Sequence, residues 1–471
     1  MMENNRKLIR QLDTLFNPRS LAIVGVPRGL KTGKLFLLAL KDTGYAGRIY
    51  PVHPEAEEIE GLKAYPDIAS VPEAVDLAIV LVPHHRSLPV VRGCADKGVK
   101  GVVLFTAGFK ETHSEEGKSR EAELTHIART SHMRIMGPNC MGVYCPKSGV
   151  SNFPELSKEP GPVGVISHSG SLTNILGRLG PQRGIHFSKM VSLGNECDLH
   201  SAELLAYLGQ DEDTLVIGAY LEGIKDGPGF LKALKATTQD KPVVLWKLGL
   251  TPEGSWAAAS HTGSLAGSGE IWEGVIAQGS AVSVTGFDEW VDTLMGFTLL
   301  PRSDGNRIAI ISGPGGLAVS AAEACGRSGL RLAELSDDTR ATLAEMIPPT
   351  GTSLRNPVDV GFTAYLDIHI YADAARAVAA DKGVDALMVV GIGSTPKTNR
   401  MYVDAMIDAR RESETPFLMV SIPGFDAALA TEFCRSGIPF FDTPERAAAT
   451  YARIRTYWQW REKISSGVTT P

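Results

Sequence analysis

Two short segments combine hydroxyl groups and small residues in a way that suits phosphate chemistry. Ser169, Gly170 and Ser171 follow an apolar run and open a helical segment, so backbone amides and the positive end of the helix dipole would face an anion. We expect His261 to lie in a loop of about twenty residues without strand character, and the Ser, Thr, Gly and Ala residues at 259–267 leave its imidazole sterically open to act as a nucleophile. The alternatives are a simple helix N-cap and an ordinary exposed histidine.

Two further loops follow apolar runs. Glu222 stands at the end of one run, where its carboxylate could accept a hydrogen bond from a histidine and fix the tautomer of the ring. Asn139 lies in the segment GPNCMG (137–142) after another run. The alternatives are a surface carboxylate for Glu222 and a plain Asn/Gly turn for Asn139.

The segment 25–34 is rich in glycine, follows the first apolar run and opens a helix. Its cations, Arg28, Lys31 and Lys34, together with backbone amides at the helix start, suit a phosphorylated ligand. The spacing is not GxGxxG, and the next run ends in PVHP (51–54) without an acidic residue for a ribose hydroxyl, which argues against NAD. The alternative is a glycine-rich turn that binds nothing.

The elements that must position these loops are short apolar runs that alternate with segments of helical length. Such alternation predicts parallel sheets covered on both faces, with ligands beyond the carboxyl ends of the strands. We expect three α/β domains, at 1–145, 160–300 and 305–471, with a Pro/Ser-rich linker at 145–162 and a C-terminal amphipathic helix. The expected strands lie at 20–26, 48–52, 77–82, 100–105, 133–137, 163–171, 187–195, 214–223, 242–249, 307–316, 386–393, 416–424 and 438–442.

Composition limits the function classes. The 471 residues include 47 basic and 53 acidic side chains, a net charge of −6, and no long basic run, so nucleic acid is not an expected partner. The six cysteines form no CxxC pair, so neither a metal site nor a disulfide framework is predicted, and a cytoplasmic location fits. No run reaches the roughly 18–20 apolar residues of a membrane span, and no secretory signal is present.

The motifs, in their order, resemble those of the α subunit, or α-like half, of ADP-forming acyl-CoA synthetases, relatives of succinyl-CoA synthetase. The resemblance covers about residues 14 to 455. It implies a Rossmann-like CoA-binding domain followed by two flavodoxin-like, doubly wound parallel-sheet domains. Its most specific segments are GPNCMG (137–142), SLGNECD (192–198), YLEGIKDG (220–227), SHTGSLAG (260–267) and NPVDV (356–360).

The resemblance also implies roles for individual residues. His261 would be transiently phosphorylated, Glu222 would steady the phosphohistidine, and Ser169, Gly170 and Ser171 would receive the phosphoryl group. His168 stands where the family usually has Gln or Arg, so we hypothesise that anion affinity at this loop depends on pH. The first loop departs from the family's GAS, and VHP (52–54) from its VNP. The implied CoA contacts are Gly25, Val26, Pro27, Arg28, Gly33, Lys34, Val52, His53, Pro54 and Asn139.

The implied reaction converts a small carboxylic acid, CoA and ATP to acyl-CoA, ADP and phosphate, reversibly, through an acyl phosphate. We find no ATP-grasp nucleotide domain in the sequence and expect a separate ATP-grasp β subunit that holds ATP or ADP and Mg, in an αβ or α2β2 assembly. Two other readings stay open. The chain could be a CoA-binding regulatory module, or an acyl or carbamoyl transferase that uses no nucleotide.

Overall fold

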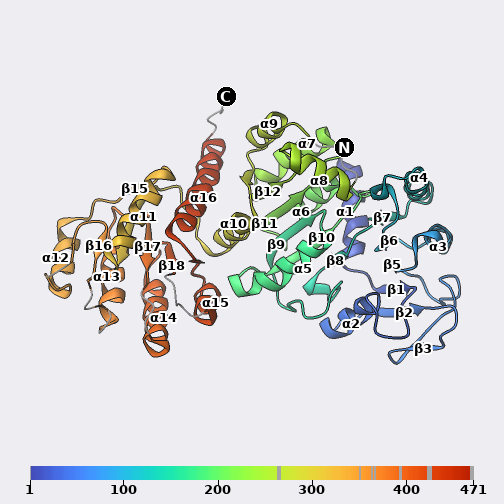
Figure 1. The fold of residues 1–471 in the computed structure, drawn as a ribbon, viewed down its shortest axis with the longest axis horizontal. Helices are drawn as coiled ribbons and strands as arrows, with labels where there is room; N and C mark the ends of the chain where they lie inside the picture. The colour runs from blue at the N-terminus through green and yellow to red at the C-terminus, as the bar shows by residue number, and fades with distance from the viewer. Residues whose placement is uncertain are drawn as a thin grey trace. The chain divides into compact units, whose positions relative to one another are not determined.

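The computed structural model describes residues 2–262, 267–349, 352–361, 364, 367–391, 395–421 and 427–466, with side chains undescribed at 2–7 and 260–262. Packing divides the chain into two compact units. The first unit consists of residues 1–179 and 186–285, and the second of residues 180–185 and 286–471. The first unit contains two large sheets and the second unit contains one (Figure 1).

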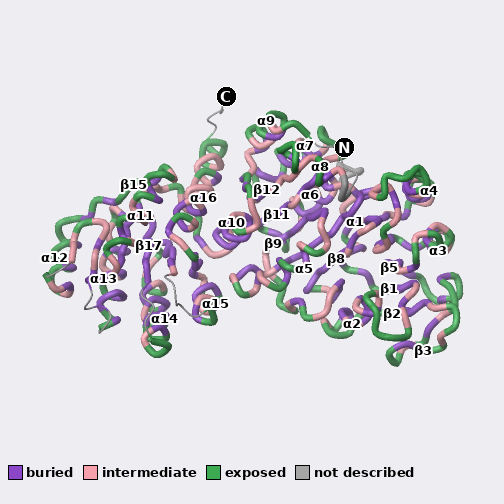
Figure 2. Tube along the Cα trace, in the orientation of Figure 1, coloured by how far each residue is buried: buried purple, intermediate pink, exposed green. Residues whose placement is uncertain are grey.

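The first sheet is five-stranded and parallel, in the order β2-β1-β5-β6-β7. All five predicted strands are present, and most of their residues are buried because helices cover both faces (Figure 2). The elements of this region are α1 (Met2–Phe16), β1 (Ser20–Val24), α2 (Lys34–Thr43), β2 (Arg48–Val52), the hairpin β3 (Glu58–Ile59) and β4 (Leu62–Lys63), β5 (Leu77–Val80), α3 (His84–Lys97), β6 (Gly101–Leu104), η1 (Lys110–Thr112), α4 (Glu115–Ser131) and β7 (Arg134–Met136).

The second sheet has six strands in the order β13-β12-β11-β9-β10-β8, and β8 is antiparallel to β10. The four predicted strands are confirmed as β9 to β12, and helices lie on both sides of the sheet (Figure 1). The elements are β8 (Gly142–Tyr144), η2 (Pro146–Ser148), β9 (Pro160–Ser167), α5 (Gly170–Leu179), β10 (Phe187–Ser192), α6 (Ser201–Gln210), β11 (Val216–Leu221), α7 (Gly227–Thr238), β12 (Val243–Lys247), α8 (Pro252–Thr262), α9 (Gly269–Gly279) and β13 (Val282–Val284).

The third sheet has the order β15-β14-β17-β18-β19, with β16 also paired to β14. The predicted strands are confirmed as β14, β17, β18 and β19, and the predicted C-terminal helix as α16. The elements of the second unit are η3 (Gly180–Arg183), α10 (Phe287–Leu299), β14 (Arg307–Ser312), α11 (Gly315–Arg327), β15 (Arg331–Leu332), α12 (Asp337–Met346), β16 (Val358–Asp359), α13 (His369–Ala379), β17 (Ala386–Val390), α14 (Pro396–Arg411), β18 (Phe417–Val420), α15 (Ala427–Arg435), β19 (Phe440–Phe441) and α16 (Pro444–Ser465).

All three sheets share one topology. With the antiparallel β8 and the additional strand β16 left aside, the described parallel strands of each sheet, numbered along the chain, lie in the order 2-1-3-4-5. The chain therefore moves to one side of the first strand and then crosses to the other, which opens a crevice beyond the carboxyl end of that strand. In the first unit, the crevices lie after β1 and β9, where the segment 25–33 and the residues 168–171 were predicted to bind phosphates.

The segment predicted as a linker is packed rather than free. The hydroxyl of Ser148 donates to the Phe16 carbonyl at 2.6 Å, and the hydroxyl of Thr43 donates to the Gly149 carbonyl at 2.6 Å. Both bonds join this segment to helices of the first sheet. Together with β8, they hold the first two sheets in a single unit.

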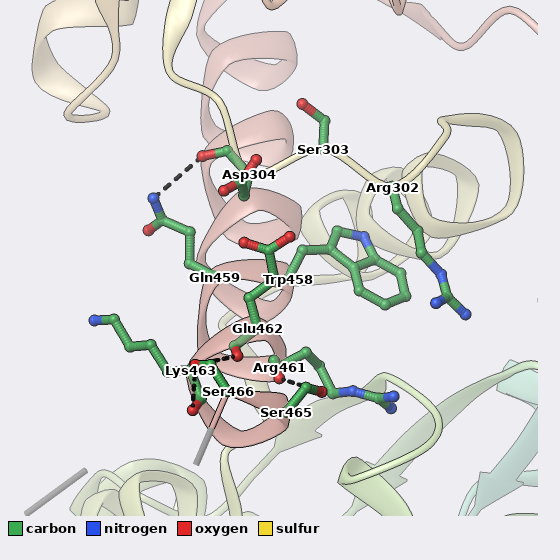
Figure 3. Close-up of a pocket in the computed structure, with 10 residues that line it drawn as sticks. All are labelled: Arg302, Ser303, Asp304, Trp458, Gln459, Arg461, Glu462, Lys463, Ser465 and Ser466. Carbon is green, nitrogen blue, oxygen red and sulfur yellow. Dashed lines mark hydrogen bonds between the residues drawn. The ribbon is translucent and has the colours of Figure 1, made fainter. Parts of the chain in front are cut away.

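Helix α16 begins with Thr443 as its N-cap and Pro444 in its first turn, and it lines a surface pocket with residues 302–304 (Figure 3). The guanidinium of Arg302 lies 4.6 Å from the ring centre of Trp458, and the amide of Gln459 donates to the Asp304 carbonyl at 3.1 Å. None of the predicted site residues lines this pocket. Within the described part of the chain, no helix has both the length and the apolar character that a bilayer crossing requires.

Candidate functional site

The first predicted loop leaves β1 at the crevice of the first sheet. Gly25 has a φ of +87°, and a Cβ there would lie 2.7 Å from Val82 Cγ1, so this position favours glycine. Val26 is buried beneath the loop, whereas Arg28 is exposed, with its guanidinium 3.6 Å from the Glu55 carboxylate. The loop therefore presents backbone and Arg28 at the carboxyl edge of the sheet.

Lys34 does not present a free cation to this loop. Its side chain is buried, and its Nζ donates to the Arg28 carbonyl at 2.6 Å and pairs with Glu60 Oε1 at 2.6 Å. The hydrogen bond and charge of Lys34 hold the pKa of Glu60 below its ordinary value. The amine therefore fixes the loop, and Gly33 caps α2 without a side-chain bond.

The predicted contacts on the second strand lie beside this loop. The N–H of Gly25 donates to the Val52 carbonyl at 2.9 Å. His53 forms hydrogen bonds within its own loop: its Nδ1 accepts the N–H groups of Glu55 and Ala56, each at 3.2 Å. Pro54 is exposed at the same edge.

The first loop contacts Val82, from which hydrogen bonds lead to Asn139. The hydroxyl of Thr106 donates to the Val82 carbonyl at 2.6 Å, and the N–H of Asn139 donates to the Thr106 carbonyl at 3.1 Å. Asn139 has a φ of +60°, in the left-handed region that Asn tolerates better than most residues. The carboxyl-end loops of β1, β5, β6 and β7 thus form one continuous edge.

The SLGNECD segment continues this edge onto the second sheet. The N–H of Asn195 donates to the Pro138 carbonyl at 3.0 Å, and that of Cys197 to the Gly137 carbonyl at 2.9 Å. Gly194 approaches so closely that a Cβ would lie 2.2 Å from Pro138 O and 2.3 Å from Asn139 O. Asn139 therefore lies against the SLGNECD segment, at the carboxyl end of β10 in the second sheet.

The start of α5 lies next along the edge. A Cβ on Gly170 would lie 2.4 Å from Met141 Cγ, so the loop that carries Asn139 packs on the first turn of the helix. The Ser169 hydroxyl lies 3.2 Å from that of Ser171 and accepts the N–H of Leu172 at 3.3 Å, as an N-cap does. The cap and the anion site are compatible, because the first N–H groups of a helix have no partner within it.

His168 is buried and does not face an anion at α5. Its Nδ1 accepts the N–H of Glu222 at 2.9 Å, and its Nε2 lies 3.2 Å from Glu196 Oε1. Nδ1 therefore serves as an acceptor, and Nε2 is directed at the Glu196 carboxylate. The ring is thus directed at Glu222 and Glu196, and a pH-dependent anion affinity at this loop stays a prediction.

Glu196 is a buried carboxylate at this site. Burial opposes its ionisation, but His168, the N–H of Ser201 and the charge of Lys225 together hold its pKa below the ordinary value. Ser201 donates to Glu196 Oε1 at 2.7 Å. The ammonium of Lys225 donates to the carbonyls of Asn195 and Glu196 at 2.6 and 2.7 Å, which ties the YLEGIKDG segment to SLGNECD.

Glu222 is buried just beyond β11, rather than exposed in a loop. The hydroxyl of Tyr220 donates to Glu222 Oε1 at 3.2 Å, and burial together with this carboxylate raises the pKa of Tyr220. On the other side, Lys247 at the end of β12 donates to the Glu222 carbonyl at 2.9 Å. Its own strand, through Tyr220, and the neighbouring β12, through Lys247, therefore hold Glu222 in place.

The segment around His261 differs from the prediction. We expected a loop of about twenty residues, but the backbone forms α8 from Pro252 to Thr262. A proline and a glutamate in the first turn and three consecutive alanines at 257–259 favour a helix. His261 lies in the last turn of α8, while its side chain and residues 263–266 lie outside the described residues.

Helix α8 begins against the edge that holds Glu222. A Cβ on Gly249 would lie 3.6 Å from both the Glu222 carbonyl oxygen and Ala258 Cβ. The hydroxyl of Ser255 donates to the Gly249 carbonyl at 2.9 Å. Ala258 precedes His261 by three residues, so the helix that carries His261 packs beside Glu222.

Three residues at this edge were not identified from the sequence as site residues: Glu196, Lys225 and Lys247. Lys247 ends a strand of otherwise apolar residues, and Glu196 has a φ of +54° in a turn. A lysine that ends an apolar run at the carboxyl edge was a usable signal. The partners of Glu196 depend on the fold and leave no local pattern.

Two family models match the regions described above. Residues 19–146 match the family model described as a CoA binding domain, and residues 160–297 match the model described as a succinyl-CoA ligase like flavodoxin domain. These two ranges contain the two sheets of the first unit and all the predicted site residues.

Relatives and solved structures match along nearly the whole chain. The α subunit of acetate–CoA ligase [ADP-forming] II from Pyrococcus furiosus is 38% identical, over 97% of this chain and 99% of its own. A 4-hydroxybutyrate–CoA ligase [ADP-forming] from Nitrosopumilus maritimus is 30% identical, over 97% of this chain and 65% of its own. The acetyl-coenzyme A synthetase 1 of Ca. Korarchaeum cryptofilum, solved with phosphate and ADP, has a TM-score of 0.86 and 31% identity, over 98% of this chain and 99% of its own. The chain therefore belongs to the family of ADP-forming acyl-CoA synthetases, as an α subunit.

Proposed function

We propose that this chain binds CoA along the carboxyl edge of its first sheet, carries phosphate on His261 and forms acyl-CoA from a small carboxylic acid. The observation that carries the proposal is the continuous line of loops in the first unit. It runs from Gly25 through Val82, Thr106 and Asn139 to the start of α5. A thiol cofactor bound along this line reaches the phosphoryl site without leaving the unit.

The proposed chemistry has three balanced steps. An imidazole nitrogen of His261 attacks the γ-phosphorus of ATP, and an N–P bond forms as the bond to the β-phosphate oxygen breaks and ADP leaves. A carboxylate oxygen of the acid then attacks the same phosphorus, which forms an acyl phosphate and releases the imidazole. The CoA thiol loses its proton and attacks the acyl carbon, so that a C–S bond forms and inorganic phosphate departs.

Different residues at this edge would stabilise the phosphoryl group, orient His261 and bind CoA. The N–H groups at Gly170 and Ser171 and the dipole of α5 would stabilise charge on the phosphoryl group in transfer. Glu222 would accept a hydrogen bond from the imidazole of His261 and orient it. Arg28 and the backbone of 25–33 would hold the phosphates of CoA, with Val52, His53 and Pro54 alongside, and Asn139 would lie near the thioester.

The binding of the nucleotide that phosphorylates His261 would belong to a partner subunit. We propose an ATP-grasp β subunit that binds ATP or ADP and Mg, in an αβ or α2β2 assembly in the cytoplasm. The Nitrosopumilus relative, of which this chain spans 65%, supports a division in which the remaining length supplies a further domain. We assign CoA binding to residues 1–145, phosphoryl transfer to 160–300 and the second flavodoxin-like domain to 305–471.

The test uses the reaction in reverse. The chain is incubated with acetyl-CoA and ³²P-labelled inorganic phosphate, and protein-bound label is tested for lability in acid and stability in base. We expect such label in the unmodified chain and none in His261→Ala. Label that survives in His261→Ala would contradict the assignment to His261.

Two control reactions distinguish the alternatives. With γ-labelled ATP, we expect label only after a candidate ATP-grasp subunit is added. A regulatory module would bind CoA but take label from neither donor. A transferase that uses no nucleotide would exchange CoA with acetyl phosphate and leave His261 unlabelled.

A further inference from the structure

Lys247 is the last residue of β12, and its amine lies at the sheet edge that holds Glu222. The strand register pairs Leu221 of β11 with Lys247, so the amine lies beside the residue that follows Leu221. Its Nζ donates to the Glu222 carbonyl at 2.9 Å and also to the carbonyl of Leu248. An ammonium has three donors. Among the described residues, no third acceptor is hydrogen-bonded to Nζ.

Gly249 lies between the amine and α8. A Cβ placed on Gly249 would lie 3.8 Å from Lys247 Nζ, and 3.6 Å from both the Glu222 carbonyl oxygen and Ala258 Cβ. Gly249 has a φ of +78°, which favours glycine, so no side chain at this position separates the amine from Ala258. The amine therefore lies close to the helix whose last turn contains His261.

The amine is partly desolvated. Burial lowers the pKa of Lys247 to about 8, and the charge of Glu222 acts in the opposite direction. Tyr220 on β11 donates to the Glu222 carboxylate, His168 after β9 accepts the N–H of Glu222, and Glu253 is exposed in the first turn of α8. The side chain of His261 lies outside the described residues. β13 contributes no titratable group. A second anion at this place would favour the charged amine strongly, because an ion pair is little screened in a partly buried site.

We propose that Lys247 is a phosphoryl-binding residue, which donates its third N–H to the phosphoryl group on His261 while Glu222 orients the imidazole. This inference rests on the phosphohistidine of the proposed function. Lys247 also positions Glu222, because it holds the carbonyl of that residue while His168 holds the N–H. Lys247, the last residue of β12, would thus be the cation that contacts the phosphoryl group.

The test compares three variants in the labelling reaction with acetyl-CoA and ³²P-phosphate. Lys247→Met removes the charge, and Lys247→Arg keeps it. Lys241→Met is the matched control: Lys241 lies just before the other end of β12, its Nζ donates to the carbonyls of Leu208 and Asp211 at 3.0 and 2.5 Å, and burial likewise lowers its pKa. Thermal unfolding of each variant checks that the fold is intact.

We expect Lys247→Met to reduce the label about ten- to a hundredfold, the effect of one charge-assisted hydrogen bond, and Lys241→Met to leave it unchanged. Because Arg stays charged, the ratio of label in the unmodified chain to label in Lys247→Arg should fall as pH rises through about 8. Label in Lys247→Met equal to that in Lys241→Met would overturn the role of Lys247 alone. Absence of label in the unmodified chain would instead overturn the proposed function, and this inference with it.

Discussion

The imidazole of His168 accepts the backbone N–H of Glu222 through Nδ1 at 2.9 Å. Both residues are buried, and the other ring nitrogen faces the Glu196 carboxylate at 3.2 Å. His168 therefore acts as a spacer between two carboxylate-bearing loops. Substitution of His168 should therefore displace Glu222, and it should affect anion binding at the start of α5 less directly.

We expect His168→Ala to lower the free energy of unfolding by about 1–3 kcal/mol, because it leaves a buried N–H without an acceptor. His168→Asn should cost less, since its side-chain oxygen can replace Nδ1 as the acceptor. Urea unfolding of both variants measures the difference. Equal losses would mean that the bond to Glu222 contributes nothing.

Glu196→Gln should lower the free energy of unfolding by about 1–3 kcal/mol near neutral pH. The folded pKa of Glu196 is lowered, so its contribution is present above the unfolded pKa of roughly 4.5 and is lost as pH falls through the folded value. The difference in the free energy of unfolding between the variant and the unmodified chain should therefore become smaller below about pH 4.5. Unfolding curves at several pH values test this, with the exposed Glu253→Gln as the control. A difference in the free energy of unfolding that does not change with pH would contradict the ionised state of the Glu196 carboxylate.

Gly194→Ala should separate the loop of Asn139 from the second sheet. The new Cβ would meet two backbone oxygens at 2.2 and 2.3 Å, at a φ of +56°. We expect CoA still to bind but labelling from acetyl-CoA and phosphate to fall at least about tenfold, the effect of small misplacement on transfer chemistry. Gly44→Ala is the control, because it has a φ of +75° and open space around it. An equal fall in both variants would attribute the effect to backbone strain alone.

Arg28 and Lys34 should respond differently to substitution. Arg28→Ala removes an exposed cation and should weaken CoA binding about two- to fivefold at low salt, with less effect at high salt. Lys34→Met removes the amine that joins the Arg28 carbonyl to Glu60 and should chiefly lower the thermal midpoint. Calorimetric titration with CoA and thermal unfolding separate the two effects. Weaker CoA binding in Lys34→Met at unchanged stability would place its amine on the cofactor.

The strands could be predicted because each is a local apolar run bounded by turn residues. Their sheet order, and hence the crevices after β1 and β9, follows from the usual winding of such folds. Helix α8 was missed because Ser, Thr, Gly and His around residue 261 obscured the alanines at 257–259 that favour a helix.

The surroundings of Glu222 could not be predicted from local sequence. His168 precedes it by 54 residues, and Lys247 follows it by 25. Only the pairing of β11 with both β9 and β12 brings these side chains together. The hydrogen-bonding state of His168 likewise depends on Glu196, a residue of a third loop.

The edge that joins Gly25 to the start of α5 is built largely from backbone atoms at Val82, Thr106, Pro138 and Gly137. Backbone bonds do not depend on which side chains surround them. The span between the first loop and α5 is therefore set by the main chain and by the glycines at 25 and 194, and it should keep its length when exposed side chains along it are substituted.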